Sequence, residues 1–230
     1  FSELQLDPQQ PSNPSRDRFV LSKGHAAPAL YAVMAKRGFF PEEELATLRK
    51  IGSRLQGHPD SKKLPGVDIS SGSLGMGISF GIGCALAARL SGQPYRTYIL
   101  TGCGELDEGQ NWEGLMTAAK YGLDNLMAIV DYNKVQLDGT NDEILPLGDL
   151  CAKLRAFSWN VLECDGHNVQ ELLDAYEQAR AKKGIPTVLV AHTIKGKGVS
   201  FMEHKCQWHG APISEQQYAC AMAELEGVSI

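Results

Sequence analysis

The sequence predicts an α/β fold built on a mainly parallel sheet that is flanked by helices. Two short apolar runs, residues 98–101 and 126–131, have the composition of strands that are buried on both faces. Residues 112–121 form a helical segment between them, and this alternation is typical of a parallel sheet with right-handed crossovers. Such sheets bind ligands at the carboxyl ends of their strands, so we expect the functional residues along that edge.

Before residue 98, the sequence predicts an irregular start followed by helices. Residues 1–18 are rich in Pro, Ser, Gln and Asp, a composition that indicates an irregular surface segment. Residues 28–37 have helical spacing, which Gly38 ends. Three glutamates follow Pro41, a pattern typical of a helix start, and we expect this helix to reach about Ile51.

A further helix is predicted within residues 72–90, where glycines recur at positions 75, 77, 81 and 83. Each glycine inside a helix costs about 1 kcal/mol relative to alanine, so something must compensate for them. We expect the helix to press tightly against another backbone, and the same helix to lie at a subunit contact. No strand precedes these glycines and their spacing is not G-x-G-x-x-G, which argues against a dinucleotide-binding loop.

Strands and helices continue to alternate beyond residue 131. Residues 161–164 predict a strand, and the next helix opens at Asn168, with Glu171 placed three residues later as in a capping box. Residues 184–191 then predict a final strand. The sequence has no internal repeat and no low-complexity tract, so we expect residues 1–230 to form a single domain.

The composition narrows the class of protein. Hydrophobic residues make up 43% of the chain and charged residues 21%, which is ordinary for a globular protein. The net charge of −5 gives no basic excess for nucleic acid or an anionic membrane, and no apolar run approaches the roughly 20 residues of a transmembrane helix. The six cysteines show no paired spacing, and the start resembles no secretory leader, so we expect a reducing, cytoplasmic location.

Two polar turns follow neighbouring predicted strands. Gly102-Cys-Gly104 follows the first strand, and Asp131-Tyr-Asn133 follows the second. Paired glycines let backbone N–H groups approach phosphate oxygens, whereas an ordinary strand-to-helix turn predicts only one glycine. Asn133 by itself would more often be a turn residue, but its distance from the glycine turn favours a ligand. We therefore expect a diphosphate and its divalent cation where the two turns meet.

Seven motifs in the same order make the chain resemble the amino-terminal, diphosphate-binding half of a transketolase. They extend from about residue 16 to residue 213. The motifs are Ser22-Lys-Gly-His-Ala-Ala-Pro28, Gly57-His-Pro59, Ser71-Gly-Ser-Leu-Gly-Met-Gly77, Gly102 to Gly109, Asp131-Tyr-Asn133, Thr193-Ile-Lys-Gly-Lys-Gly198 and Trp208-His-Gly210. This resemblance implies thiamine diphosphate as the cofactor.

The resemblance also implies a Mg²⁺ or Ca²⁺ site. It assigns the side chain of Asn133 and the backbone carbonyl of Val135 as ligands, and its third ligand is an aspartate where this chain has Cys103. A thiol is a soft ligand and a poor partner for these hard cations. Three interpretations stay open: weaker metal binding, replacement by water or by Glu105 or Asp107, and loss of activity. Cys103 could also be an inert thiol that fills space beside the turn.

The remaining site positions also come from the resemblance. It implies three catalytic histidines, of which His25 and His209 contact the diphosphate side and the sugar while His58 lines the substrate channel. Glu108 corresponds to a residue at the subunit interface, although it could equally be a solvated carboxylate at a helix start. The cofactor-binding positions are Lys23, His25, Gly72, Ser73, Leu74, Gly102, Gly104, Glu105, Asn133, Lys195 and His209. We expect solvent-exposed side chains at Lys197, His167, His192 and His204.

The resemblance covers only part of an active site. In this family, a glutamate from a separate pyrimidine-binding domain activates the cofactor, and nothing after residue 213 resembles that domain. An early His-Gly-Gly segment of the family is absent too, which suggests that the true start lies upstream. We therefore expect the first subunit of a split, two-gene transketolase, joined in an α2β2 assembly to a separate carboxy-terminal subunit.

The expected reaction is the transfer of a two-carbon ketol unit from a ketose phosphate to an aldose. One alternative is a non-catalytic structural or regulatory subunit that is degenerate at Cys103. A second is a related thiamine enzyme, such as a dehydrogenase first component or a deoxyxylulose-phosphate synthase, and the Ser22–Pro28 and Trp208–Gly210 motifs argue for transketolase over either. The sugar stays open, because split transketolases also serve routes with branched or sulfonated sugar phosphates.

Overall fold

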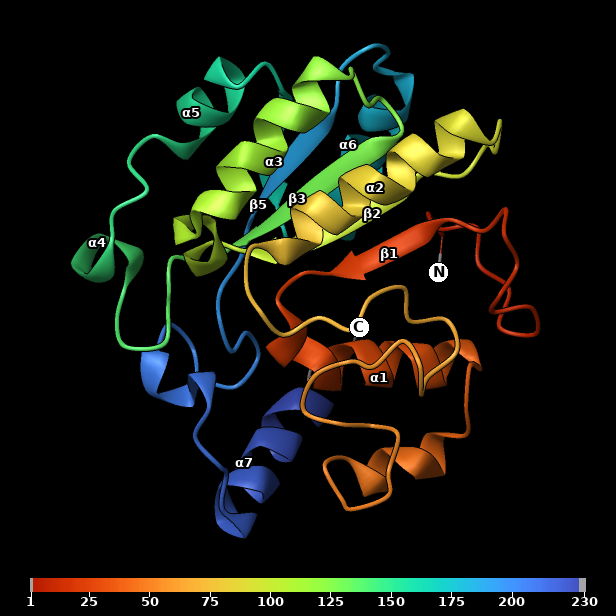
Figure 1. The fold of residues 1–230 in the computed structure, drawn as a ribbon. Coiled ribbons are helices and arrows are strands. Elements are labelled where there is room, and N and C mark those ends of the chain that lie inside the picture. The colour runs from red at the N-terminus through yellow and green to blue at the C-terminus, as the bar shows by residue number, and fades with distance from the viewer. Residues whose placement is uncertain (1, 228–230) are drawn as a thin grey trace.

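The computed structural model describes residues 2–227, and a five-stranded parallel sheet runs through them (Figure 1). Its strands are β1 (Arg18–Leu21), β2 (Thr97–Gly102), β3 (Leu126–Tyr132), β4 (Asn160–Asp165) and β5 (Thr187–His192). Their order across the sheet is β1-β2-β3-β5-β4, so the chain passes from β3 to the far edge and then returns. The predicted fold class is confirmed.

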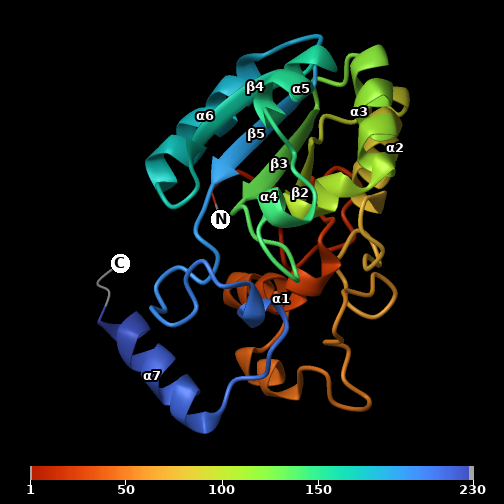
Figure 2. The ribbon, with the colours of Figure 1, turned by 90° about the vertical axis from the view of Figure 1, so that its left-hand side faces the viewer.

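Helices cover both faces of the sheet. The α-helices are α1 (Ala27–Arg37), α2 (Met76–Leu90), α3 (Gly109–Lys120), α4 (Asn141–Ile144), α5 (Leu150–Ala156), α6 (Val169–Ala181) and α7 (Glu215–Glu226). Short 3₁₀ helices are η1 (Gly24–Ala26), η2 (Glu42–Thr47), η3 (Gly104–Asp107) and η4 (Cys206–His209). Helices α2 and α3 lie on one face and α6 on the other, while α1 and α7 lie below the sheet in both ribbon views (Figures 1 and 2).

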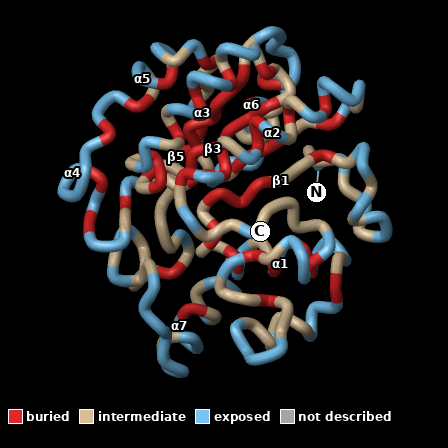
Figure 3. The backbone as a smooth tube through the Cα atoms, viewed as in Figure 1, coloured by how far each residue is buried: buried red, intermediate tan, exposed pale blue. Residues whose placement is uncertain are grey.

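The buried apolar side chains form three clusters. One fills the space between the sheet and helices α2, α3 and α5, and includes Ile99 and Leu115. A second lies between the sheet and α6, around Leu189 and Ala179, and a third surrounds Tyr31 of α1. The buried parts of the chain therefore concentrate along the strands and the helices beside them (Figure 3). Burial on both faces explains why the strands read as apolar runs.

The glycines of α2 account for its close contact with the sheet. A Cβ atom at Gly77 would collide with Ser22 beside β1, and one at Gly81 would collide with Ile99 of β2. The predicted packing against another backbone is confirmed at Gly77, while Gly81 packs against the side chain of Ile99. The side of Gly83 is open within the described chain, so a subunit contact there stays a prediction. The helix begins at Met76, later than expected, because Gly75 has a left-handed backbone (φ 82°).

The prediction of a helix over residues 41–51 is wrong, because only the 3₁₀ helix η2 forms and it ends at Thr47. The chain then turns back, with Arg49 in a left-handed conformation (φ 61°) and its N–H bonded to the carbonyl of Leu55 at 2.8 Å. Ile51 is fully exposed. Without a buried partner for Ile51, the good helix start has nothing to pack against and does not propagate.

Strand β1 was not predicted, because its four residues adjoin a segment with the composition of a loop. It pairs in parallel with β2, with Arg18 opposite Thr97. The preceding residue, Asp17, is buried and accepts hydrogen bonds from the N–H groups of Gln5 and Arg96 at 2.8 Å each. The carboxylate of Asp17 thereby ties the irregular amino-terminal segment to the start of β2.

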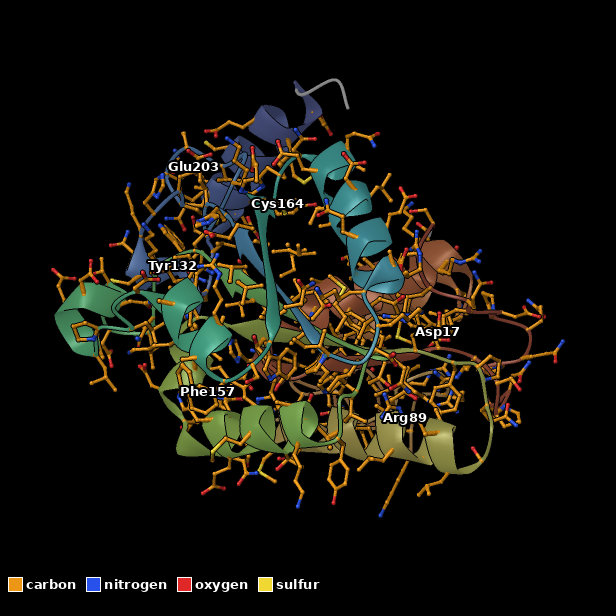
Figure 4. The ribbon with its side chains drawn as sticks, turned by 90° about the horizontal axis from the view of Figure 1, so that it is seen from above. Asp17, Arg89, Tyr132, Phe157, Cys164 and Glu203 are labelled. Atoms are coloured by element: carbon orange, nitrogen blue, oxygen red, sulfur yellow. The ribbon has the colours of Figure 1, made fainter. Side chains whose placement is uncertain are left out.

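The strands all run in one direction, so their two ends form two different edges. Figure 4 shows Asp17 and Arg89 at the edge where the strands begin, and Tyr132 and Glu203 at the opposite edge. The second edge gathers the carboxyl ends of β2, β3 and β5, together with the loops that follow them. This is the edge at which the sequence predicts the site.

The later elements agree with the predictions in most respects. Asn168 caps α6 by accepting hydrogen bonds from the N–H groups of Gln170 and Glu171. In a full capping box, the carboxylate of Glu171 would accept a hydrogen bond from the backbone N–H of Asn168. Here it accepts one from the N–H of Asp165, so only half of the predicted capping box forms. Within residues 2–227, no helix combines the length and apolar composition that crossing a membrane requires. All six cysteines lie in this range and are free thiols.

Candidate functional site

The two polar turns lie side by side, as the sequence predicts. Gly102 pairs with Asp131 across β2 and β3, and the N–H of Cys103 donates to the carbonyl of Asp131 at 3.2 Å. A cavity of about 380 Å³ opens beside these turns. The predicted residues that line it are Lys23, His25, Leu74, Gly102, Cys103, Gly104, Glu105, Asn133, Val135, Lys195 and His209.

The glycine turn brings the backbone close to the cavity. A Cβ atom at Gly104 would lie 2.9 Å from the side chain of Gln136, and one at Gly102 would lie 3.5 Å from Lys23. A side chain at 104 would therefore force Gln136 to move, while glycine leaves the main chain accessible. Accessible peptide N–H groups at such a turn favour an anionic ligand.

Glu105 is buried behind this turn, and its carboxylate joins three segments of the chain. One oxygen accepts hydrogen bonds from the hydroxyl of Ser22 and from the N–H of Gly75, and the other accepts from the N–H of Gly102 at 3.2 Å. Both oxygens are thus engaged by the protein. This arrangement argues against Glu105 as a replacement metal ligand. Asp107, the other candidate, accepts a hydrogen bond from Gln136 at 2.9 Å through one oxygen, while its other oxygen is buried without a partner among the described residues; Asp107 does not line the cavity.

Four basic side chains line the cavity and form what we term the basic wall: Lys23, His25, Lys195 and His209. The two imidazole rings have centroids 4.9 Å apart. Burial, His209, Lys23 and Lys195 lower the pKa of His25 to about 4, and burial with both lysines also lowers the pKa of His209. Burial and the charge of Lys23 lower the pKa of Lys195. Mutual repulsion of this kind indicates a site built for an anion.

The basic wall also contains a polar atom without a partner. The Nδ1 atom of His209 is buried and makes no hydrogen bond with any described residue. Buried polar atoms are nearly always paired, so an unpaired one indicates a missing ligand. With the glycine turn and the two lysines, this atom makes the cavity suitable for a diphosphate group.

Asp131 is a site residue that the sequence-based assignment omitted. Its carboxylate accepts hydrogen bonds from Lys23, from Thr193 and from the amide of Asn133. Burial alone would raise the pKa of Asp131, but Lys23, Thr193 and Asn133 together lower it. Asp131 therefore fixes a residue of the basic wall and a predicted metal ligand. Its place two residues before Asn133, at the end of a buried strand, was the available signal.

A second set of lining residues, Cys103, Asn133 and Val135, forms what we term the cation wall, together with Asn141, which contacts Cys103. The amide oxygen of Asn133 accepts a hydrogen bond from the N–H of Val135 at 3.0 Å. The Cys103 sulfur is buried, 3.8 Å from that oxygen and 3.6 Å from the amide oxygen of Asn141. Among residues 2–227, no group of three or more His, Cys, Asp or Glu side chains is arranged to hold a metal ion. Asn141 was not among the predicted residues.

The two walls differ in how well they fit the expected ligands. The diphosphate fits the basic wall. A hard cation fits the oxygens of Asn133 and Val135 but does not fit the thiol of Cys103, which replaces the family aspartate.

The other predicted positions lie around the cavity without lining it. His58 is exposed, and its ring lies beside Gly72, where a Cβ atom would be 3.5 Å away. It is still close enough to contribute to the lowered pKa of His25. Glu108 is exposed at the start of α3 and lies against Gly75. Ser73 is exposed as well. The side chains that were expected to be exposed are so: Lys197, His167, His192 and His204.

The chain was compared with known protein families and structures. Residues 1–226 match the family model described as transketolase, thiamine diphosphate binding domain. The 6-deoxy-6-sulfo-D-fructose transketolase subunit SqwG of a Clostridium species is 47% identical over 98% of this chain and 82% of its own length. An apulose-4-phosphate transketolase subunit from Phocaeicola vulgatus is 39% identical over 98% of this chain and 80% of its own length.

Solved structures agree with these matches. A crystal structure of the Pichia stipitis transketolase in complex with sedoheptulose-7-phosphate superposes with a TM-score of 0.92 at 30% identity. The match covers 97% of this chain and 35% of the Pichia protein, so the chain spans about a third of that enzyme's length.

Proposed function

The chain belongs to the transketolase family, through its thiamine-diphosphate-binding domain, and we propose that it serves the transfer of a two-carbon ketol unit from a ketose phosphate to an aldose. The observation that supports this most directly is the convergence of Lys23, His25, Lys195 and His209 on one cavity beside the glycine turn. The similarity to transketolase subunits over 98% of the chain does not favour the non-catalytic alternative.

The residues of the basic wall have separable tasks. Lys23, Lys195 and the N–H of Gly104 would hold the diphosphate through charge and hydrogen bonds, while the N–H of Gly102 stays bonded to Glu105. When bound, thiamine diphosphate supplies the electron sink for breaking and forming the carbon–carbon bond beside a ketose carbonyl. The unpaired Nδ1 atom of His209, when it carries the ring proton, would donate a hydrogen bond to a phosphate or sugar oxygen.

The histidines are suited to proton transfer. Because the pKa of His25 is lowered to about 4, its imidazole is neutral near pH 7 and can accept a proton from a sugar hydroxyl. His58, exposed beside Gly72, would orient the sugar at the mouth of the cavity. Residues 72–74 would bracket the thiamine ring. Among them, Leu74 lines the cavity.

A second subunit would complete the active site. We infer that a separate carboxy-terminal subunit supplies the pyrimidine-binding domain and the activating glutamate in an α2β2 assembly. Two relatives that this chain matches over most of their length are named as subunits, which supports this inference. Glu108 would lie at the contact, and the helices that begin beside it, α2 and α3, carry the exposed apolar side chains of Met76, Phe80 and Met116.

The substrates proposed for the complex are anionic ketoses. Relatives are named for 6-deoxy-6-sulfo-D-fructose and for apulose-4-phosphate, so a sulfonated or branched ketose is the donor that we would test first. A cytoplasmic location fits the free thiols, which match a reducing compartment.

The test is a titration of thiamine diphosphate and divalent cation into the chain alone and into the chain with its carboxy-terminal partner. We expect saturable cofactor binding in at least the reconstituted pair, and ketol transfer from one of the named donors. Absence of cofactor binding in both preparations would contradict the proposal.

A further inference from the structure

Two carboxylates, those of Asp131 and Glu105, line the cavity, and the protein already engages both. Asp131 accepts hydrogen bonds from Lys23, Thr193 and Asn133. Glu105 is engaged by three segments of the chain, and Asp107 lies outside the cavity. The residue that lines the cavity at the aspartate position is therefore Cys103.

The Cys103 thiol lies between two amide groups. Its sulfur is 3.6 Å from the amide oxygen of Asn141 and 3.8 Å from the amide oxygen of Asn133, and the thiol is the donor in both contacts. Asn141 is 3% exposed, and its Nδ2 atom is buried with no hydrogen-bond partner among the residues that the structure describes. This amide presents its oxygen to the thiol, and turning it over would bring the N–H donor that has no acceptor to a negatively charged sulfur.

The loop of the cation wall also holds Asn141 in position. Val135 and Thr140 form a β-bridge, and the N–H of Asn141 donates to the carbonyl of Lys134 at 3.0 Å. Thr140 then caps α4 through a reciprocal pair of bonds with Glu143. The amide that flanks Cys103 is thus attached to the same loop that supplies Asn133 and Val135.

We propose that the cation wall selects a borderline, thiophilic divalent cation, of the class of Co²⁺ or Zn²⁺, over Mg²⁺ and Ca²⁺. The Cys103 sulfur forms a bond to the cation and its proton leaves to solvent, while Asn133 and Val135 contribute oxygen ligands. Asn141 is a positioning residue, whose amide turns its N–H to the thiolate. Thiolates favour such cations, whereas hard cations prefer all-oxygen sites. This inference rests on the proposed function, because the diphosphate completes the site.

The test uses Co²⁺, since a cobalt–thiolate bond gives a charge-transfer absorption band that does not depend on activity. The full chain, alone and with its partner subunit, is titrated with Co²⁺ or Mg²⁺ in the presence of thiamine diphosphate. We expect the band to appear with Co²⁺, and Co²⁺ to bind at least about tenfold more tightly than Mg²⁺.

Variants assign the band to this site. Cys103→Ser should abolish the band, and Cys220→Ser, which changes an exposed cysteine of α7, should keep it. Asn141→Ala should keep the band but weaken Co²⁺ binding about tenfold, the usual cost of losing a group that orients a ligand, with Mg²⁺ binding unchanged. If Asn141 has a purely structural role, Asn141→Ala should weaken the binding of Co²⁺ and Mg²⁺ equally.

The outcomes separate the two proposals. If thiamine diphosphate binds with Mg²⁺ while Co²⁺ gives no band, or if the band survives in Cys103→Ser, the thiophilic site is overturned and the proposed function stands. Equal or tighter binding of Mg²⁺ overturns it as well. If thiamine diphosphate fails to bind in both preparations, whichever cation is added, both proposals fail.

Discussion

The basic wall and the cation wall face one cavity, yet they are built in opposite ways. The basic wall holds four cationic or titratable side chains, and burial together with their mutual repulsion lowers the pKa values of His25, Lys195 and His209. The cation wall offers neutral amides, a carbonyl and a thiol. The contrast indicates that recognition of the diphosphate is built into the chain as charge, whereas recognition of the cation depends on which metal accepts these donors.

The two walls are joined through Asp131 and Glu105. Asp131 bonds to Lys23 of one wall and Asn133 of the other. Glu105 accepts hydrogen bonds from Ser22, which precedes Lys23, and from the N–H of Gly102, which precedes Cys103. Substitutions of Asp131 or Glu105 should therefore weaken binding of both the diphosphate and the cation. Substitutions within one wall should weaken binding of only one of these ligands.

The largest effect is expected from Glu105→Gln. The amide would keep the side chain's size but would place N–H donors against the N–H groups of Gly75 or Gly102. Breaking a buried, charge-assisted network of this kind costs on the order of 3 kcal/mol of unfolding free energy. Urea denaturation measures this cost, and binding of thiamine diphosphate should weaken together with stability.

Glu113→Gln is the matched control for this variant, because Glu113 is an exposed residue of α3. Its urea midpoint should match that of the natural chain. An unchanged midpoint in Glu105→Gln would show that this carboxylate does not hold the two walls together.

Removing one charge from the basic wall should come next. Lys195→Met keeps the length of the side chain but deletes a cation that lines the cavity. We expect thiamine diphosphate to bind roughly 10- to 100-fold more weakly, since a bond to a charged group contributes about 1.5–3 kcal/mol. Calorimetric titration gives the affinity directly.

Lys197→Met is a demanding control, because Lys197 lies two residues away in the same glycine loop and is exposed. It should bind the cofactor within about twofold of the natural chain, as expected for a solvated surface charge. Equal losses at the two positions would mean that the charge of the whole loop, and not the basic wall, determines affinity.

Cys103→Asp tests the cation wall, since it gives this wall the missing carboxylate. We expect Mg²⁺ affinity in the presence of thiamine diphosphate to rise about tenfold, because a hard cation gains a hard, charged ligand. Without ligands the variant should be less stable than the natural chain, because position 103 is only 1% exposed and a buried charge without a partner is costly.

The same variant discriminates between the catalytic and non-catalytic interpretations. If the natural chain transfers no ketol unit with any cation and Cys103→Asp does so with Mg²⁺, the natural chain is impaired and the non-catalytic alternative gains support. If Mg²⁺ affinity does not change, position 103 is not part of the cation wall.

Local patterns sufficed to predict the sheet and the meeting of the two turns. The runs at 98–101 and 126–131 are apolar because both faces of β2 and β3 are covered, so their burial is visible in composition. Once two parallel strands are neighbours, the residues that follow them meet. This is why Gly102 and Asn133 could be assigned to one site from the sequence.

The features that were missed depend on contacts between distant residues. Four residues of β1 become a strand only by pairing with β2. The bond from Lys23 to Asp131 spans 108 positions, so neither residue signals it locally. Asn141 reaches Cys103 because the loop before it folds back through the bridge of Val135 with Thr140, a turn that no periodic pattern encodes.

The smallest expected effect is a change in the number of protons that His25 binds. Burial and the neighbouring His209, Lys23 and Lys195 lower the pKa of His25 to about 4, well below the 6.5 of an unfolded histidine. Between these two values the unfolded chain binds more protons, so the contribution of His25 to stability is complete above pH 6.5 and declines as the pH falls towards 4. A bound diphosphate should reverse the repulsion and raise this pKa.

Binding of an anion near pH 5.5 should therefore take up a fraction of a proton. Calorimetry with inorganic pyrophosphate, in two buffers that differ in ionisation enthalpy, measures this uptake. His25→Gln should reduce it, whereas His204→Asn, which changes an exposed residue with a left-handed backbone that asparagine tolerates, should leave it unchanged. Proton release, or equal uptake in His25→Gln, would show that the charges of the basic wall do not act on the ligand through this imidazole.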